Sequence, residues 1–182
     1  MPNAFLLYLG ILYVFKLRSN ILFMKYQPQE SVLTLSNLHT YLFAALFTAG
    51  NVVLPQLCHL VPQGGLIFQP IYLFTVVAAC RWGWRVALLT ALVSPLLNTF
   101  LFAMPSVAML PVVLLKSVVL ALGVSWSMAG KVRNPMMTAC LFIVGAQLLG
   151  GLAEYALLSS ATTLWFCLPG VALQVAVARM LK

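Results

Sequence analysis

The sequence predicts an all-α integral membrane protein with a six-transmembrane-helix core and both ends of that core in the cytoplasm. Of its 182 residues, 63% are hydrophobic and only 7% are charged. Soluble domains, by contrast, are about half apolar and about one quarter charged. Long apolar runs alternate with short polar connectors, and the length allows roughly six or seven spans of about 20 residues each. No room is left for a soluble catalytic domain.

The chain divides into an N-terminal segment, residues 1–37, and a membrane domain, residues 38–182. The N-terminal segment holds a short apolar stretch that is followed by Lys16 and Arg18 and then by a polar linker. A signal peptide would carry its positive charges before the apolar region instead of after it. We therefore interpret residues 1–23 as either an extra hydrophobic anchor or a start-site artefact.

The membrane domain contains six apolar runs that we predict to be helices. The second run is short, and Gln69 and Pro70 blur its start, whereas the other five are long enough to cross a bilayer. The predicted spans are residues 40–57, 67–80, 84–103, 107–129, 136–158 and 162–180.

Positive charges fall on alternate connectors, which predicts the orientation of the helices. Three connectors, around residues 59, 104 and 159, carry no Lys or Arg. Cations flank membrane spans on the cytoplasmic side, so these three connectors are expected outside. The net charge of +8 is spread singly along the chain and does not form the basic face of a nucleic-acid-binding protein. The flanking cations are Lys25, Arg81, Arg85, Lys131, Arg133, Arg179 and Lys182.

Two charged residues, Lys116 and Glu154, lie well inside predicted spans. Placing a charge at the middle of a membrane helix costs roughly 2.5–3.5 kcal/mol on the insertion scale, so such residues are usually paired or functional. Two interpretations stay open at this point. Lys116 and Glu154 pair with each other, or Lys116 holds an anionic group of a ligand while Glu154 binds a polar one.

Other polar side chains gather near the outer ends of the predicted helices. Polar side chains in lipid need internal partners or a water-filled cavity, so this distribution indicates a pocket that opens outward. The alternative is ordinary solvation of helix ends at the membrane interface. The predicted ligand contacts are His59, Gln63, Gln69, Tyr72, Asn98, Lys116, Glu154 and Tyr155.

The connector "CHLVPQGGLIFQP", residues 58–70, combines Pro and Gly residues that prevent a simple continuous helix. Irregular backbone at membrane depth is tolerated where protein covers it or where it lines a cavity. We therefore expect a folded-back element over the outer ends of the helices. In the preceding run, "AALFTAG", Ala45 and Ala49 are four residues apart and share one helix face. Such a face lets another helix approach closely, either within this chain or from a partner.

Together, "AALFTAGNVVLPQLCHLVPQGG", "PIYLFTVVAACRWGWRVALLTALVSPLLNTFLFAMP" and "LPVVLLKSVVLAL" resemble the substrate-binding S components of energy-coupling factor (ECF) vitamin transporters. The resemblance covers about residues 38–180. It implies a protein of the bacterial plasma membrane that binds one vitamin or related micronutrient at its outer face. It also implies that Ala45 and Ala49 dock against a transmembrane coupling subunit, that residues 58–66 cover the site, and that two ATP-binding subunits drive release inside.

Two other function classes were weighed against transport. A small membrane scaffold or assembly protein would need packing surfaces but no outward pocket. An intramembrane enzyme is disfavoured, because the chain has two acidic residues, lacks G-x-S-x-G, and has four cysteines without metal-ligand spacing. No enzymatic activity, metal or cofactor is therefore expected.

Overall fold

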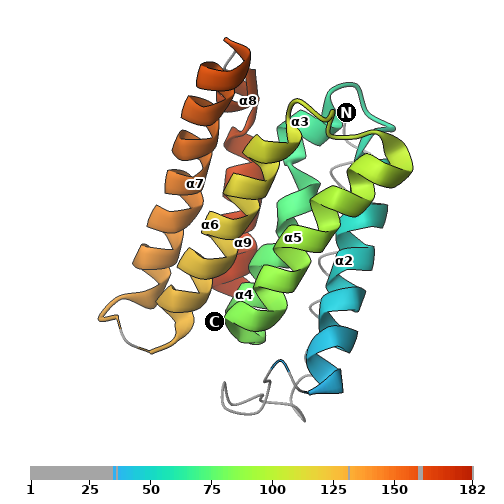
Figure 1. The fold of residues 1–182 in the computed structure, drawn as a ribbon. Coiled ribbons are helices and arrows are strands. Elements are labelled where there is room, and N and C mark those ends of the chain that lie inside the picture. Colours follow the sequence, from blue (N-terminus) through green and yellow to red (C-terminus); the bar gives the residue numbers. More distant parts are fainter. Residues whose placement is uncertain (1–34, 36, 131, 160–161, 182) are drawn as a thin grey trace.

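The computed structural model describes residues 35, 37–130, 132–159 and 162–181. Apart from short connectors, this part of the chain is helical (Figure 1). The predicted N-terminal segment lies almost entirely outside the described residues. In chain order the elements are α2 (Leu38–Cys58), α3 (Gly64–Phe68), the 3-10 helix η1 (Pro70–Tyr72), α4 (Leu73–Arg81), α5 (Gly83–Phe102), α6 (Leu110–Met128), α7 (Pro135–Leu158), α8 (Thr162–Phe166) and α9 (Leu168–Met180).

The all-helical membrane class agrees with this architecture. Within the described residues, five helical segments are long and apolar enough to cross a membrane. These are α2, the interrupted segment from α3 to α4, α5, α6 and α7. The sixth predicted span, residues 162–180, consists of α8 and the 13-residue α9. A helix of that length is about 20 Å long, shorter than the roughly 30 Å hydrocarbon core, so the count of six spans stays a prediction.

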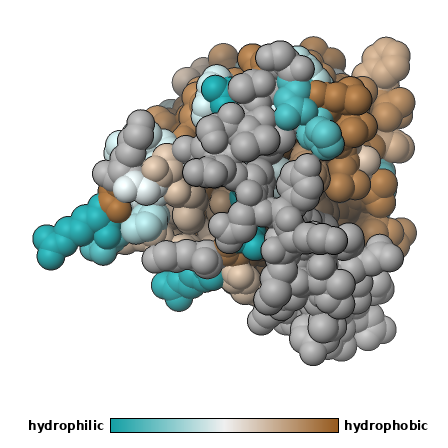
Figure 2. Space-filling model, turned by 90° about the horizontal axis from the view of Figure 1, so that it is seen from below, coloured by the Kyte–Doolittle hydropathy of each residue, from teal (hydrophilic) through white to brown (hydrophobic). Residues whose placement is uncertain are grey.

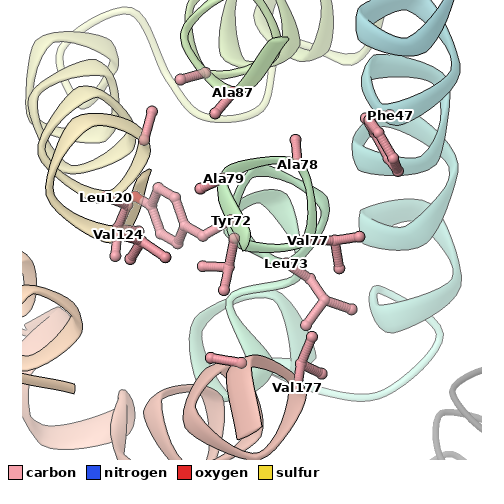
Figure 3. Close-up of a cluster of buried hydrophobic side chains, with 14 of the residues drawn as sticks. Phe47, Tyr72, Leu73, Val77, Ala78, Ala79, Ala87, Leu120, Val124 and Val177 are labelled. Carbon is pink, nitrogen blue, oxygen red and sulfur yellow. The ribbon is translucent and has the colours of Figure 1, made fainter. Parts of the chain in front are cut away.

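Helix α4 lies at the centre of the bundle, with α2, α5, α6 and α9 around it (Figure 3). Small side chains make this position possible, since Ala78 and Ala79 are fully buried between the neighbouring helices. On one side the rings of Phe47 and Trp82 meet edge to face with their centroids 4.8 Å apart. Tyr72, just before α4, extends its ring toward α6 (Figure 3). The core is thus built around a helix that begins in the middle of an interrupted crossing.

The two ends of the bundle differ in charge. One end, here called the α3 end, holds α3, α8 and the connector 103–109 (Figure 1). The opposite end holds the C-termini of α4, α6 and α9, and hydrophilic residues project from it (Figure 2). We call it the cationic end, because four of the five Lys and Arg residues in the described part of the chain lie there. They are Arg81, Arg85, Arg133 and Arg179.

A proline in α2 creates the first polar link between helices. Pro55 has no backbone N–H, so the carbonyl of Asn51, four residues earlier, loses its usual helical donor. The side-chain amide of Asn98 from α5 donates to this carbonyl at 3.0 Å. The same amide also donates to the Ser94 carbonyl within α5, at 3.0 Å. Pro55 therefore exposes a backbone acceptor that joins α2 to α5.

The Asn51 side chain extends the link to α4. Its Nδ2 donates to Thr75 Oγ1 at 3.1 Å and to Ser94 Oγ at 3.2 Å. Its Oδ1 accepts from the backbone N–H of Phe74 at 3.1 Å. That N–H lies in the first turn of α4, where backbone donors lack intrahelical partners. Asn51 is fully buried and acts as a cap supplied by a different helix.

We predict that Asn51→Leu lowers the free energy of unfolding by about 1–3 kcal/mol, because it leaves a backbone donor and two hydroxyls without their partner. The matched control is Gln56→Leu in the same helix. The Nε2 of Gln56 is buried and has no hydrogen-bond partner in the part of the chain that the structure describes, so its removal should cost little. Reversible denaturation in detergent measures both variants, and equal losses would contradict the capping role.

Candidate functional site

A cavity of about 370 Å³ opens at the α3 end. Its walls come from α2, from α3 and η1, from Asn98 of α5, from the connector 103–109, from α6 and from Thr163 of α8. Met104, Pro105 and Met109 supply much of the apolar lining. Six of the eight predicted ligand contacts line this cavity: His59, Gln63, Gln69, Tyr72, Asn98 and Lys116.

The cavity exists because the second membrane crossing is interrupted at Gln69 and Pro70. Gln69 adopts a left-handed conformation, with φ 46° and ψ 50°, between α3 and η1. This conformation costs about 1–2 kcal/mol for a residue with a side chain. Pro70 cannot donate a backbone hydrogen bond and so cannot continue α3. Gln63, at the start of α3, is left-handed as well, with φ 58°.

A hydrogen bond from α7 holds this break in place. Nε2 of Gln147 donates to Oε1 of Gln69, with 2.5 Å between the two atoms. Both side chains are at least nine-tenths buried, so the bond forms in a low-dielectric interior where it is stronger than in water. Backbone bonds complete the junction, from the Gln69 N–H to the Gly65 carbonyl and from the Tyr72 N–H to the Gln69 carbonyl. The left-handed residue is therefore fixed from two helices.

The sequence prediction placed the start of the second span at residue 67 and a folded-back element before it. The structure shows that helix begins earlier, at Gly64, and breaks at Gln69. The Gly64-Gly65 pair allows this turn of helix to pack against the end of α2. A Cβ on Gly64 would lie 2.1 Å from the Cys58 carbonyl oxygen, and one on Gly65 would lie 2.7 Å from the His59 ring.

Lys116 forms the charged part of the cavity wall. Only 2% of the residue is exposed, and its ammonium lies 5.2 Å from the centroid of the Tyr72 ring. A cation over an aromatic face is stabilised by the ring quadrupole. The alkyl stem passes over the backbone of Gly150 in α7, where an added Cβ would meet Lys116 Cδ at 2.2 Å. Because Gly150 has no side chain, the Lys116 stem can pass over α7 and its ammonium can reach the cavity.

Glu154 lies behind the cavity wall. Its Oε2 accepts a hydrogen bond from the hydroxyl of Thr163 and another from the Thr163 backbone N–H, the latter at 3.3 Å. Thr163 lines the cavity, so Glu154 holds a lining residue and does not itself line the space. The pairing of Glu154 with Lys116, one of the two interpretations of the sequence, stays a prediction.

Tyr155 does not lie with the residues that line the cavity. It is 65% exposed on the outer surface of α7. Successive residues of a helix point about 100° apart, and because Glu154 faces the interior, Tyr155 faces away from it. Tyr155 thus lies at a depth in its span similar to that of Glu154, but its side chain points in a different direction.

Three residues that shape the site were not among the predicted contacts. Gln147 holds Gln69, Thr163 connects the cavity to Glu154, and Gly150 accommodates Lys116. The pair Gly150-Gly151, four and three residues before Glu154, is a sequence signal that could have indicated a close approach to α7. Thr163 gave no signal, because a threonine at the start of a helix is commonplace.

Ala45 and Ala49 are both exposed on α2. Neither packs into the core of this chain, so the face that they share is open to lipid or to another helix. Their assignment as a docking site stays a prediction.

The cavity presents polar groups of several kinds between apolar walls. They are one ammonium, several amides, an imidazole and the hydroxyls of Tyr72, Ser106 and Thr163. Within the described residues, no group of three or more His, Cys, Asp or Glu side chains is placed to hold a metal ion. No family model, curated protein or solved structure matches the chain. The resemblance to S components therefore stays a prediction.

We predict that Gly150→Ala destabilises the protein by about 1–3 kcal/mol, because the new methyl group overlaps the Lys116 stem. Gly145→Ala in the same helix is the control. No described atom outside its own stretch of helix lies within 4 Å of its Cβ position, so the substitution should be neutral or stabilise the protein by about 0.5–1 kcal/mol.

A double-mutant cycle tests the cause of this loss. In a Lys116→Ala background, Gly150→Ala should cost little, since the overlapping stem is gone. Free energies of unfolding in detergent give the coupling. A penalty that is unchanged in the Lys116→Ala background would contradict the proposed contact.

Proposed function

We propose that this protein captures a vitamin or related micronutrient at the outer face of a bacterial plasma membrane and passes it inward to an ATP-driven ECF coupling module. The observation that carries the proposal is the cavity at the α3 end, with buried Lys116 in its wall. A cation kept inside a membrane domain is by default a functional residue. Here it borders a space that a small molecule can enter.

The charge distribution supports an outward opening. By the positive-inside rule, the cationic end belongs to the cytoplasmic face. The cavity lies at the opposite end of the bundle and so faces outside. This orientation suits capture of a dilute nutrient, followed by release after a conformational change.

The lining supports a ligand that is partly apolar and carries an anionic group. Lys116 provides the positive charge, while Gln69 and Asn98 present amides that can fix orientation. Met104 and Met109 offer adaptable apolar surface. A volume of about 370 Å³ is within the usual range of roughly 300–1,000 Å³ for small-molecule sites.

Under this proposal, energy for release comes from partners. The resemblance assigns it to two ATP-binding subunits that act through a transmembrane coupling subunit. The exposed face of α2 with Ala45 and Ala49 suits close helix packing against that subunit. No nucleic-acid partner is part of the proposal.

Mass spectrometry of small molecules that co-purify with the protein identifies the ligand directly. A panel of vitamins and precursors then tests binding by thermal stabilisation, since a ligand of the native state stabilises it by RT ln(1 + [L]/Kd). If nothing co-purifies and no panel member stabilises the protein, capture is wrong. Co-purification with cell-wall machinery in place of ATP-binding subunits would then identify the scaffold.

For an identified anionic ligand, we predict that Lys116→Gln weakens affinity about ten-fold or more, since a hydrogen bond to a charged group is lost. Arg133→Gln removes an equal charge at the exposed cationic end and should leave affinity unchanged. Titration calorimetry in detergent compares the two variants. Equal affinity of Lys116→Gln and the native protein would show that Lys116 does not hold the anion.

A further inference from the structure

A second hollow, of about 510 Å³, lies toward the cationic end on the face of α6 between α5 and α7. Trp84 of α5 and Phe142 of α7 form its sides, and Leu122, Ser125 and Trp126 of α6 form its floor. Helix α6 packs against both neighbours (Figure 1). We call this hollow the α6 groove.

Close packing between α6 and α7 shapes the groove. The Phe142 ring lies against Gly123, where an added Cβ would be 2.2 Å from the ring. Trp126 meets Phe142 edge to face, with the ring centroids 5.9 Å apart. Trp84, Leu122 and Trp126 nevertheless remain between 42% and 51% exposed. The groove thus presents ordered aromatic surface with no part of the described chain covering it.

Ser125 supplies a polar atom at the floor of the groove. It is 3% exposed, and its hydroxyl has no hydrogen-bond partner among the described residues. Ser127, two residues later, instead donates to the Gly123 carbonyl at 2.7 Å. A buried hydroxyl without a partner costs free energy, most of all within a membrane. An acceptor on a molecule in the groove would satisfy Ser125.

The side chains along the groove change from polar near the membrane surface to apolar at depth. Arg85 and Ser125 are within about 5 Å of the ends of their helices. The guanidinium of Arg85 lies 5.0 Å from the centroid of the Trp84 ring. Leu122 and Phe142 lie about 10 Å in from the helix ends. Near the membrane surface a hydroxyl therefore lines the groove and a cation lies beside the Trp84 ring that forms one of its sides, whereas apolar side chains line it at depth.

We propose that the α6 groove is a binding site for an anionic phospholipid. The phosphate and ester oxygens lie near Arg85 and Ser125, and an acyl chain runs along Leu122 and Phe142. Two observations favour a lipid as the occupant. The order of polar and apolar groups matches that of a phospholipid lying along the bilayer normal, and the cation beside the groove complements an anionic headgroup. Tryptophan at this level is typical of the membrane interface. The site is separate from the cavity at the α3 end and does not depend on what that cavity binds.

Quenching of tryptophan fluorescence by brominated lipids tests the proposal on the full chain reconstituted in vesicles. Brominated phosphatidylglycerol, which is anionic, is compared with brominated phosphatidylcholine in otherwise identical phosphatidylcholine vesicles. Phosphatidylglycerol should quench at several-fold lower mole fraction, and Trp126→Phe should remove much of this selective component. Equal quenching by the two lipids would overturn the proposal.

Variants assign the selectivity to the groove. Arg85→Gln should weaken the preference for phosphatidylglycerol about five-fold, and Ser125→Ala, which removes a hydroxyl without a partner, should weaken it a few-fold while the fold is kept. Arg133→Gln at the same end is the charge-matched control and should keep the preference. Equal loss in Arg133→Gln and Arg85→Gln would overturn the site. A photo-crosslinking side chain at Leu122 that captures a protein in cells instead of lipid would do the same.

Discussion

The cavity at the α3 end depends on the break in the second membrane crossing. Gln69, Pro70 and Tyr72, which form the break, line the cavity, and a continuous helix from Gly64 to Arg81 would place them differently. Pro70 prevents that helix, and the Gln147 side chain stabilises the left-handed Gln69 that the break requires. Because residues in sparsely populated conformations persist where surrounding structure holds them, and often lie at functional sites, the same contact stabilises the fold and shapes the site.

Polar atoms inside the bundle follow one constraint, namely that the bilayer offers them no water. Asn51 meets it by capping α4 and binding Ser94 on α5. Lys116 meets it with the face of Tyr72 and the edge of a cavity. Ser125 has no such partner in the described residues, and its position between aromatic side chains leads to the lipid proposal. Buried polar groups are therefore the best guide to function in a chain with so few charges.

The sequence was sufficient for the helical membrane class, and six of the eight contacts predicted from it line the cavity, since apolar runs and isolated polar residues are local signals. The sequence was insufficient for features that depend on the direction in which a side chain points. Depth along the chain grouped Tyr155 with Glu154, although neighbouring residues on a helix face different ways. It also could not reveal that Gly150 faces Lys116 or that Gln147 reaches Gln69, because both contacts join segments more than 30 residues apart. The last crossing was expected to be a single helix, but α8 and α9 divide it.

The central claim is that the cavity opens to the outside of the cell. Cysteine labelling in intact cells tests it most directly, with the four native cysteines replaced by alanine and a membrane-impermeant maleimide as reagent. Gln63 is exposed at the cavity, and Arg133 is exposed at the opposite end. If the cavity opens outward, Gln63→Cys is labelled in intact cells and Arg133→Cys is labelled only after permeabilisation. The reverse pattern would contradict it.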